Sequence, residues 1–117
     1  MEAQTQTDTD KREQQSRANE ILHQLGGRRF IAMTGARNIM HDEGALIFSL
    51  PGRRFCRDGI NRVKIALNGL DLYDLTFSKI ANRRGTFTVK EVYKETGVYF
   101  DQLQAVFTAQ TGLNTHL

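Results

Sequence analysis

Arginine pairs next to glycine and phenylalanine are the most distinctive chemical feature of this sequence. The tetrad Gly-Arg-Arg-Phe occurs at residues 27–30 and 52–55, and a looser version, Arg-Arg-Gly-Thr-Phe, occupies residues 83–87. Guanidinium groups bind phosphates, an aromatic ring stacks on a base, and glycine lets a backbone approach its ligand. Alternatively, the arginines are solvated turn residues and the phenylalanines start buried strands. We expect this second role for Phe30 and Phe87, because a small domain with seven Phe buries most of them.

Phe55 differs from the other phenylalanines because charged residues surround it on both sides. In such a loop, an aromatic residue is either a loop anchor or a group that stacks on a base. The residues that we expect to contact nucleic acid combine this loop with the strand that follows it: Arg53, Arg54, Phe55, Arg57, Arg62 and Lys64.

Arg62 and Lys64 are the strongest part of this prediction. Side chains two apart on a strand share one face, so both should point the same way. The alternative is an ordinary solvated sheet face, neutralised by acids on neighbouring strands such as Asp74 or Glu91.

The charge distribution agrees with a polyanionic partner. The net charge is +3, but residues 1–20 have three bases and five acids, and residues 21–117 have thirteen bases and eight acids. A domain with an excess of five positive charges favours polyanions, although many basic proteins bind none.

Other residue types give weaker reasons to expect chemistry. The one cysteine, Cys56, has no histidine near it in sequence, and a pair with His23 or His41 would depend on the fold. Asp71 and Asp74 are three residues apart, which puts them on opposite sides of a regular strand. The run His41-Asp42-Glu43 has possible metal ligands side by side, but charged residues are expected there because it lies in a turn. No other histidine has metal-ligand spacing, and no glycine-rich phosphate loop is present. We therefore expect no catalytic residue, no metal site and no cofactor.

The pattern of apolar residues predicts one α+β domain over residues 15–117. Residues 1–14 are polar and predict a disordered tail. A short helix follows, because its apolar residues recur at helical spacing: Ala18, Ile21, Leu22 and Leu25. This apolar face either packs on the domain or pairs with a partner or a second copy of the chain.

The middle of the chain predicts an antiparallel meander of three to five strands. The run 30–35 favours a short strand or extended segment, although a buried helical turn has the same pattern. Period-two alternation and turn residues such as Asn68-Gly69 predict the further strands: 45–50, 60–67, 73–78 and 86–93.

A C-terminal helix is expected to cover the apolar face of this sheet. Its stripe contains Tyr99, Leu103, Val106, Phe107 and Gln110, and Gly112 follows the last turn. A role of this stripe in binding a partner is the weaker alternative, because a small domain needs it for its own core.

Bulk features place the chain among cytoplasmic proteins. One cysteine forms no intrachain disulfide, which fits a reducing compartment. The sequence has no apolar run of membrane-spanning length and no signal-like apolar segment, so we expect no membrane association.

Three parts of the sequence resemble a family of small proteins of phages, plasmids and other bacterial mobile elements: residues 30–38, residues 60–68, and residues 97–108 with 111–113. The resemblance implies no activity or site residues, but it favours nucleic-acid handling or binding to a host factor. A meander followed by a covering helix is also similar to small single-strand binders of the Whirly and coactivator type, by architecture alone.

These observations together predict a non-enzymatic protein that binds nucleic acid, preferably single-stranded. The alternative is a protein–protein interaction module that inhibits or regulates a host factor. In that case the acidic N-terminal segment and the helix 15–25 would matter more than the basic strand.

Overall fold

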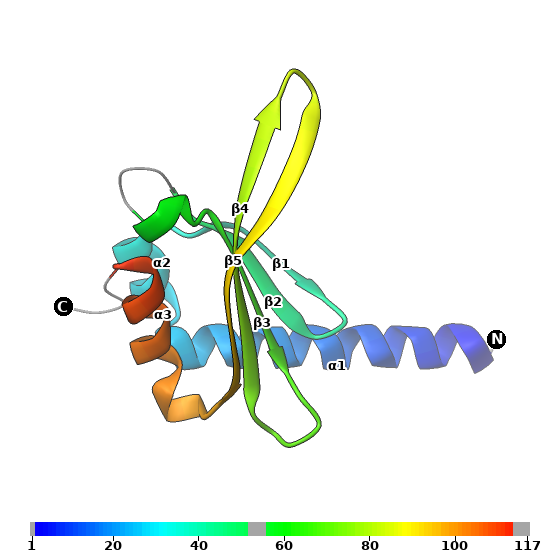
Figure 1. Ribbon diagram of the computed structural model, residues 1–117. Helices are drawn as coiled ribbons and strands as arrows, with labels where there is room; N and C mark the ends of the chain where they lie inside the picture. The colour runs from blue at the N-terminus through cyan, green and yellow to red at the C-terminus, as the bar shows by residue number, and fades with distance from the viewer. Residues whose placement is uncertain (1, 52–55, 114–117) are drawn as a thin grey trace.

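The computed structural model describes the backbone of residues 2–51 and 56–113, and the side chains of residues 12–51, 56 and 58–113. The chain has an α+β fold, in which a five-stranded antiparallel sheet packs against helices from both ends of the chain (Figure 1). The strands are β1 (Arg37–Asp42), β2 (Ala45–Ser49), β3 (Arg62–Leu67), β4 (Tyr73–Arg83) and β5 (Thr86–Val98). The helices are α1 (Glu2–Leu25), α2 (Arg28–Thr34) and α3 (Leu103–Thr111), with short 3-10 turns η1 (Arg57–Gly59) and η2 (Phe100–Gln102).

The sheet is the predicted meander, with the strand order β1-β2-β3-β4-β5. The predicted strands 45–50, 60–67, 73–78 and 86–93 correspond to β2 through β5. The turn after β3 depends on Asn68, whose Oδ1 accepts hydrogen bonds from the backbone N–H groups of Leu70 (2.8 Å) and Leu72 (3.2 Å).

β1 is a strand that the sequence pattern did not predict. All six of its residues are exposed, and apolar and polar residues do not alternate along it. The run 41–44 has the polar and glycine residues typical of a turn, but His41 and Asp42 end the strand and only Glu43-Gly44 makes the turn. Both turn residues have positive φ, 51° and 87°, which a two-residue hairpin turn requires.

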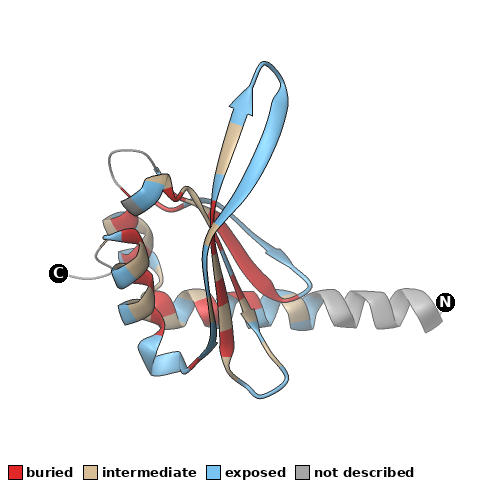
Figure 2. Cartoon of the chain, viewed as in Figure 1, coloured by how far each residue is buried: buried red, intermediate tan, exposed pale blue. Residues whose placement is uncertain are grey.

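One face of the sheet, here the inner face, packs against the helices (Figure 2). Alternate residues of the central strands supply it, for example Phe48 from β2, Val63 from β3 and Phe77 from β4. Three fully buried rings form its centre: Phe30, Phe48 and Phe107, with centroids 5.1–6.1 Å apart. Phe30 is thus a core residue, as predicted.

The segment 30–35, which we expected to be a short strand or extended, is a helix instead. Residues 28–34 form α2, and Gly35 ends it in the left-handed conformation with φ 73°. Phe30 and Thr34, four residues apart, are the buried residues of α2, so helical spacing lets one short face reach the core.

The N-terminal helix is longer than its apolar pattern indicated. α1 begins at Glu2, where the sequence predicted a tail over residues 1–14, and Figure 1 shows its first turns projecting beyond the sheet. The buried side chains of α1 are Ala18, Ile21 and Leu25, which lie in the protein's own core. Among the described residues, no helix has the length and hydrophobicity needed to cross a membrane.

The C-terminal helix covers the sheet as predicted. Leu103 and Phe107 of α3 are fully buried, and Gly112 follows the last turn with φ 80° while its N–H donates to the carbonyl of Thr108. The prediction for Tyr99 was wrong: it precedes η2 in an extended conformation and is 58 % exposed. The helical stripe therefore begins at Leu103.

Candidate nucleic-acid interface

The last hairpin of the sheet extends well beyond its neighbours. β3 pairs with β4 only as far as Arg62 opposite Ser78, whereas β4 and β5 stay paired to Arg83 opposite Thr86. Residues 79–90, here called the arm, therefore form a two-stranded ribbon that projects from the body of the protein (Figure 1). The tip is a two-residue turn, Arg84-Gly85, with φ values of 53° and 83° that match the twist of the flanking strands.

Asn61 holds the base of the arm. Its Nδ2 donates to the carbonyl of Ile80 (2.9 Å), and the Ile80 N–H donates back to Asn61 Oδ1 (2.8 Å). The Asn61 N–H also donates to the carbonyl of Ser78 (3.1 Å). A single side chain thus takes over the ladder hydrogen bonds at the point where β3 no longer reaches β4.

Replacing Asn61 by alanine should loosen the arm without unfolding the domain. Two hydrogen bonds to one backbone unit are lost, which should lower the free energy of unfolding by about 1–3 kcal/mol. Hydrogen exchange at the Ile80 amide should accelerate more than exchange at the Val63 amide in the central strand β3. Equal acceleration at the two amides would contradict a local role for Asn61.

The two faces of the arm differ in chemistry. Cross-strand pairing puts Lys79 opposite Lys90 and Arg83 opposite Thr86 on one face, here called the basic face. The other face, here called the apolar face, has Ile80 opposite Val89 and Asn82 opposite Phe87. Such a ribbon presents cations and hydrophobic groups to the same ligand from two sides.

Phe87 corrects a prediction from the sequence. We expected it in the core, but it is 69 % exposed, and its neighbour on the apolar face, Val89, is 63 % exposed. The alternation of residues 86–93 was read correctly as a strand. The register of β4 and β5 shifts between Phe77 and Ser78, which puts Phe87 and Val89 on the face of Ile80, away from the helices that pack on the inner face (Figure 2).

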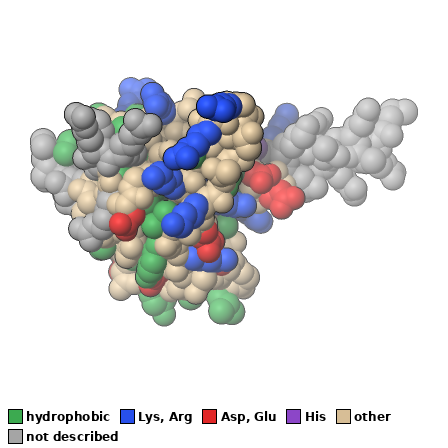
Figure 3. Space-filling view, turned by 45° about the horizontal axis from the view of Figure 1, so that its top comes forward, with side chains coloured by type: hydrophobic (Ala, Val, Ile, Leu, Met, Phe, Trp, Pro, Cys, Tyr) green, Lys and Arg blue, Asp and Glu red, His purple; other side chains and the backbone are tan. Residues whose placement is uncertain are grey.

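The arm concentrates positive charge. Residues 79–90 contain four bases and no acid: Lys79, Arg83, Arg84 and Lys90. All four are exposed, and no carboxylate lies within 4.0 Å of a lysine or arginine nitrogen in the described part of the chain. Figure 3 shows a row of basic side chains across the end of the molecule from which the arm projects.

Lys79 and Lys90 lie directly opposite each other on neighbouring strands. Like charges in this position destabilise a hairpin, because the two ammonium groups repel each other. A bound polyanion would remove this repulsion. The arrangement therefore favours an anionic ligand at the basic face of the arm.

The site residues predicted from the sequence are only partly described. Arg53, Arg54 and Phe55 lie outside the described residues, and Arg57 begins η1 with its side chain outside the described set. Arg62 and Lys64 lie together on the face of β3 opposite the core, here called the outer face, with Lys64 exposed and Arg62 half-buried.

The two acids that the alternative prediction placed beside this pair, Asp74 and Glu91, do not neutralise it. Asp74 is opposite Ala66, and its Oδ1 accepts hydrogen bonds from Asn68 Nδ2 and the Gly97 N–H, both at 3.2 Å. Glu91 is opposite Ser78, which separates it from Arg62 by one strand. Neither carboxylate forms an ion pair with Arg62 or Lys64, so both cations are available to a ligand.

A groove of about 390 Å³ lies on the outer face next to Arg62. Its apolar walls come from Ile39, Met40, Ile47 and Ile80. The polar residues that line it are Asn38, Ser49 and Arg62. Ile80 also belongs to the apolar face of the arm, so the groove and the arm are continuous.

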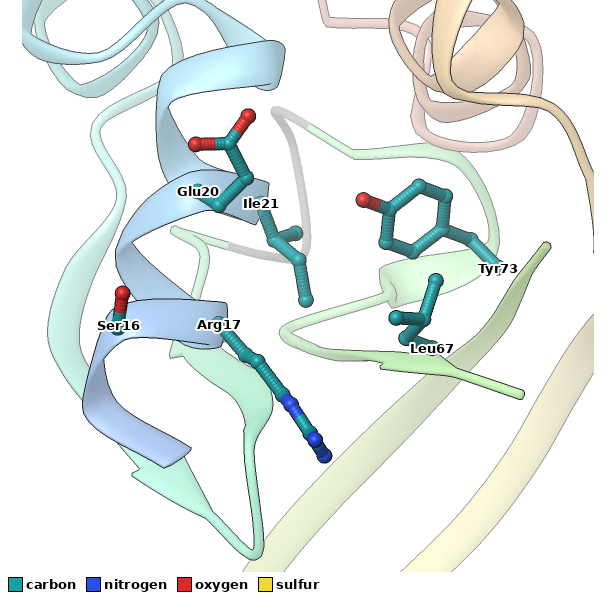
Figure 4. A pocket seen from close by; sticks show the side chains of 6 residues that line it. All are labelled: Ser16, Arg17, Glu20, Ile21, Leu67 and Tyr73. Carbon is teal, nitrogen blue, oxygen red and sulfur yellow. The ribbon is translucent and has the colours of Figure 1, made fainter. Parts of the chain in front are cut away.

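A second cavity, of about 250 Å³, lies between α1, the last residue of β3 and the first residue of β4 (Figure 4). Ile21, Leu67 and Tyr73 line its apolar part, and Arg17 and Glu20 lie at its side. Burial raises the pKa of the Tyr73 phenol above its ordinary value of 10.0; a hydrogen bond with Gln24 opposes this change, and the Glu20 and Asp71 carboxylates add to it.

This raised pKa predicts a loss of stability at alkaline pH. Well below pH 10.0 the phenol is protonated in both states, whereas as the pH approaches and passes 10.0 the unfolded chain ionises first and unfolding becomes more favourable. Urea unfolding of the wild type should therefore shift to lower urea concentration above pH 10.0 more than that of Tyr73→Phe. The matched variant Tyr99→Phe, at an exposed tyrosine, should behave like the wild type.

The candidates for catalysis do not come together. Cys56 is buried in the core cluster, whereas His23 and His41 are exposed. Asp71 has a positive φ of 60° in the turn before β4, and Asp74 lies on the outer face within the strand. Among the described residues, no three histidine, cysteine or acidic side chains are grouped as metal ligands would be.

Comparison with known proteins adds no relative: no family model, no curated protein and no solved structure matches the chain.

Proposed function

We propose that this protein binds nucleic acid without catalysing a reaction, and that the arm is its principal contact. The observation that carries the proposal is the arm itself: four exposed cations without an acidic residue, two of them directly opposed, on a ribbon with an exposed phenylalanine. A nucleic-acid strand carries one phosphate per nucleotide, so a row of cations can contact several phosphates of the same strand.

The exposed ring of Phe87 supports a preference for single strands. Stacking on an aromatic side chain requires an unpaired base, and it contributes about 1–3 kcal/mol per base. The ring is on the opposite face of the arm from Lys79 and Lys90, so one strand would place phosphates and bases on different sides of the ribbon. A two-stranded ribbon also fits the major groove of duplex DNA, which makes the duplex a necessary comparison.

Fluorescence anisotropy with labelled single-stranded DNA, duplex DNA and RNA of equal length tests the proposal. Binding should weaken with salt, because the phosphate contacts release counterions. Four contacts to a single strand predict a slope of about −3 in a plot of log affinity against log salt. Absence of binding to all three ligands at low salt would refute the proposal.

A second candidate is a protein-binding module, and one observation favours it. Leu70 in the β3–β4 turn is 80 % exposed, and Tyr99 and Phe100 next to η2 are 58 % and 63 % exposed. The turn and η2 lie at the end of the molecule opposite the arm (Figure 1). Exposed apolar groups at one end are typical of protein contacts. The apolar face of α1, in contrast, is used by the core.

A further inference from the structure

We infer that the groove on the outer face holds an unpaired nucleobase of the bound strand. This inference rests on the proposed function. It gives the protein a second base site, separate from the ring of Phe87. The groove has the two components that recognise a base: apolar side chains that pack on its ring, and polar groups that reach its edge.

The apolar component is partly open to solvent. Ile47 forms the floor, since it is 95 % buried despite lying on the outer face, where it pairs with Lys64 on one side and Met40 on the other. Met40 is 53 % exposed and Ile39 is 37 % exposed, so both still have surface that a ligand would cover. A ring placed against these side chains would remove apolar surface from water.

The polar component comes from three strands, and its three residues carry different chemical groups. Asn38 has a positive φ of 53° at the irregularity between Arg37 and Met40 in β1, which turns the backbone at the margin of the groove. Amide and guanidinium groups form paired hydrogen bonds with base edges, as asparagine does with adenine and arginine with guanine. The groove has one of each, Asn38 and Arg62, together with the Ser49 hydroxyl.

Charge favours a nucleotide over an apolar peptide as the occupant. Arg62 lines the groove without an ion pair, and Lys64 lies two residues further along the same face. A base in the groove would bring its own phosphate to these cations. A volume of about 390 Å³ also falls in the range of roughly 300–1,000 Å³ that is usual for small-molecule sites.

The spacing between the groove and Phe87 suits neighbouring nucleotides. Ile80 pairs with Val89, and the pair containing Phe87 is two residues further along the arm, which corresponds to about 7 Å. Stacked nucleotides in one strand are about 3.4 Å apart, so two or three of them span this distance. One strand can thus occupy the groove and the arm together.

Methyl NMR of the full chain tests the inference with two strands of equal charge, hexadeoxyadenylate and an abasic hexamer. Ring currents from a bound adenine should move the methyl signals of Ile39, Met40, Ile47 and Ile80 upfield, and the abasic strand should leave them in place. Both strands should perturb the amide signals of Arg83 and Arg84, because both carry phosphates.

Affinities of two variants give an independent readout. Met40→Ala should weaken binding of hexadeoxyadenylate by about fivefold, because it removes apolar surface that packs on the base, and leave binding of the abasic strand unchanged. Leu70→Ala, a truncation at an exposed site opposite the arm, should change neither affinity.

Each other outcome has a distinct meaning. If both strands bind at the arm while the groove methyls stay in place, the base site is wrong and the proposed function stands. Equal movement of the groove methyls with the two strands would make the groove a phosphate site, which also overturns the inference. If neither strand binds, the proposed function fails and the inference fails with it.

Discussion

Replacing both Arg83 and Arg84 by glutamate should weaken binding of single-stranded DNA by about 100-fold or more. Hydrogen bonds to charged groups contribute roughly 1.5–3 kcal/mol each, and two such losses exceed the roughly 2.8 kcal/mol that corresponds to 100-fold. The new carboxylates would add repulsion from the phosphates. Folding should be unaffected, because both arginines are exposed and form no ion pair in the described part of the chain.

The same sequence contains a matched control for this experiment. Arg28 and Arg29 are also adjacent and exposed, but they begin α2 on the body of the protein. Reversing either pair lowers the net charge by four, from +3 to −1. Arg28→Glu/Arg29→Glu should keep an affinity within about threefold of the wild type, since a remote charge is screened by salt. Equal losses in the two double variants would show that overall charge, and not the arm, determines binding.

Salt dependence gives this prediction a second measurement. In Arg83→Gln/Arg84→Gln, two phosphate contacts are removed without new repulsion. The slope of log affinity against log salt should therefore fall by about 1.4 in magnitude, at roughly 0.7 per contact with a single strand. An unchanged slope would mean that these arginines do not contact phosphate.

The largest effect on stability is expected for Phe30→Ala. Phe30 is fully buried and makes edge contacts with Phe48 and Phe107, at centroid distances of 5.3 Å and 5.1 Å. Removing its ring leaves a cavity where α2, β2 and α3 meet. The free energy of unfolding should fall by about 3–5 kcal/mol in urea denaturation, which is a large part of the 5–15 kcal/mol typical of a domain.

Phe87→Ala is the control with the same chemistry. The Phe87 side chain is 69 % exposed, so its truncation should change the free energy of unfolding by less than about 0.5 kcal/mol. The same variant should bind single-stranded DNA about tenfold more weakly, because one stacked base contributes roughly 1–3 kcal/mol. Stability losses of equal size in the two variants would contradict the burial pattern of the arm.

Local patterns in the sequence determined most of the strands and their order. The alternation in 60–67 and 73–78, with Asn68-Gly69 between them, indicated β3, β4 and their turn, because period two and turn chemistry depend on near neighbours only. Positions with little periodic signal were missed or misassigned. β1 has six exposed residues and no alternation, and residues 30–34 are too few to distinguish a helix from a strand.

Sequence also indicated that cationic and aromatic residues matter, but it directed attention to one set among several. Arg62 and Lys64 were placed on one face by strand geometry, which needs no tertiary information. The run 79–90, with four bases and no acid, was equally visible in the sequence. Its significance was hidden because Phe87 has the alternation of an ordinary half-buried strand.

Tertiary structure alone decided which of these apolar residues became buried. The pairing of β4 with β5 is irregular between Phe77 and Ser78, so Tyr93 lies opposite the buried Phe77, whereas Val89 and Phe87 lie opposite Ile80 and Asn82 on the outer face and remain in water. Alternation specifies that two faces exist, but burial depends on whether another element reaches a given face. For this protein, that irregularity in strand pairing placed Phe87, an expected core residue, on the exposed face of a ribbon that carries four cations.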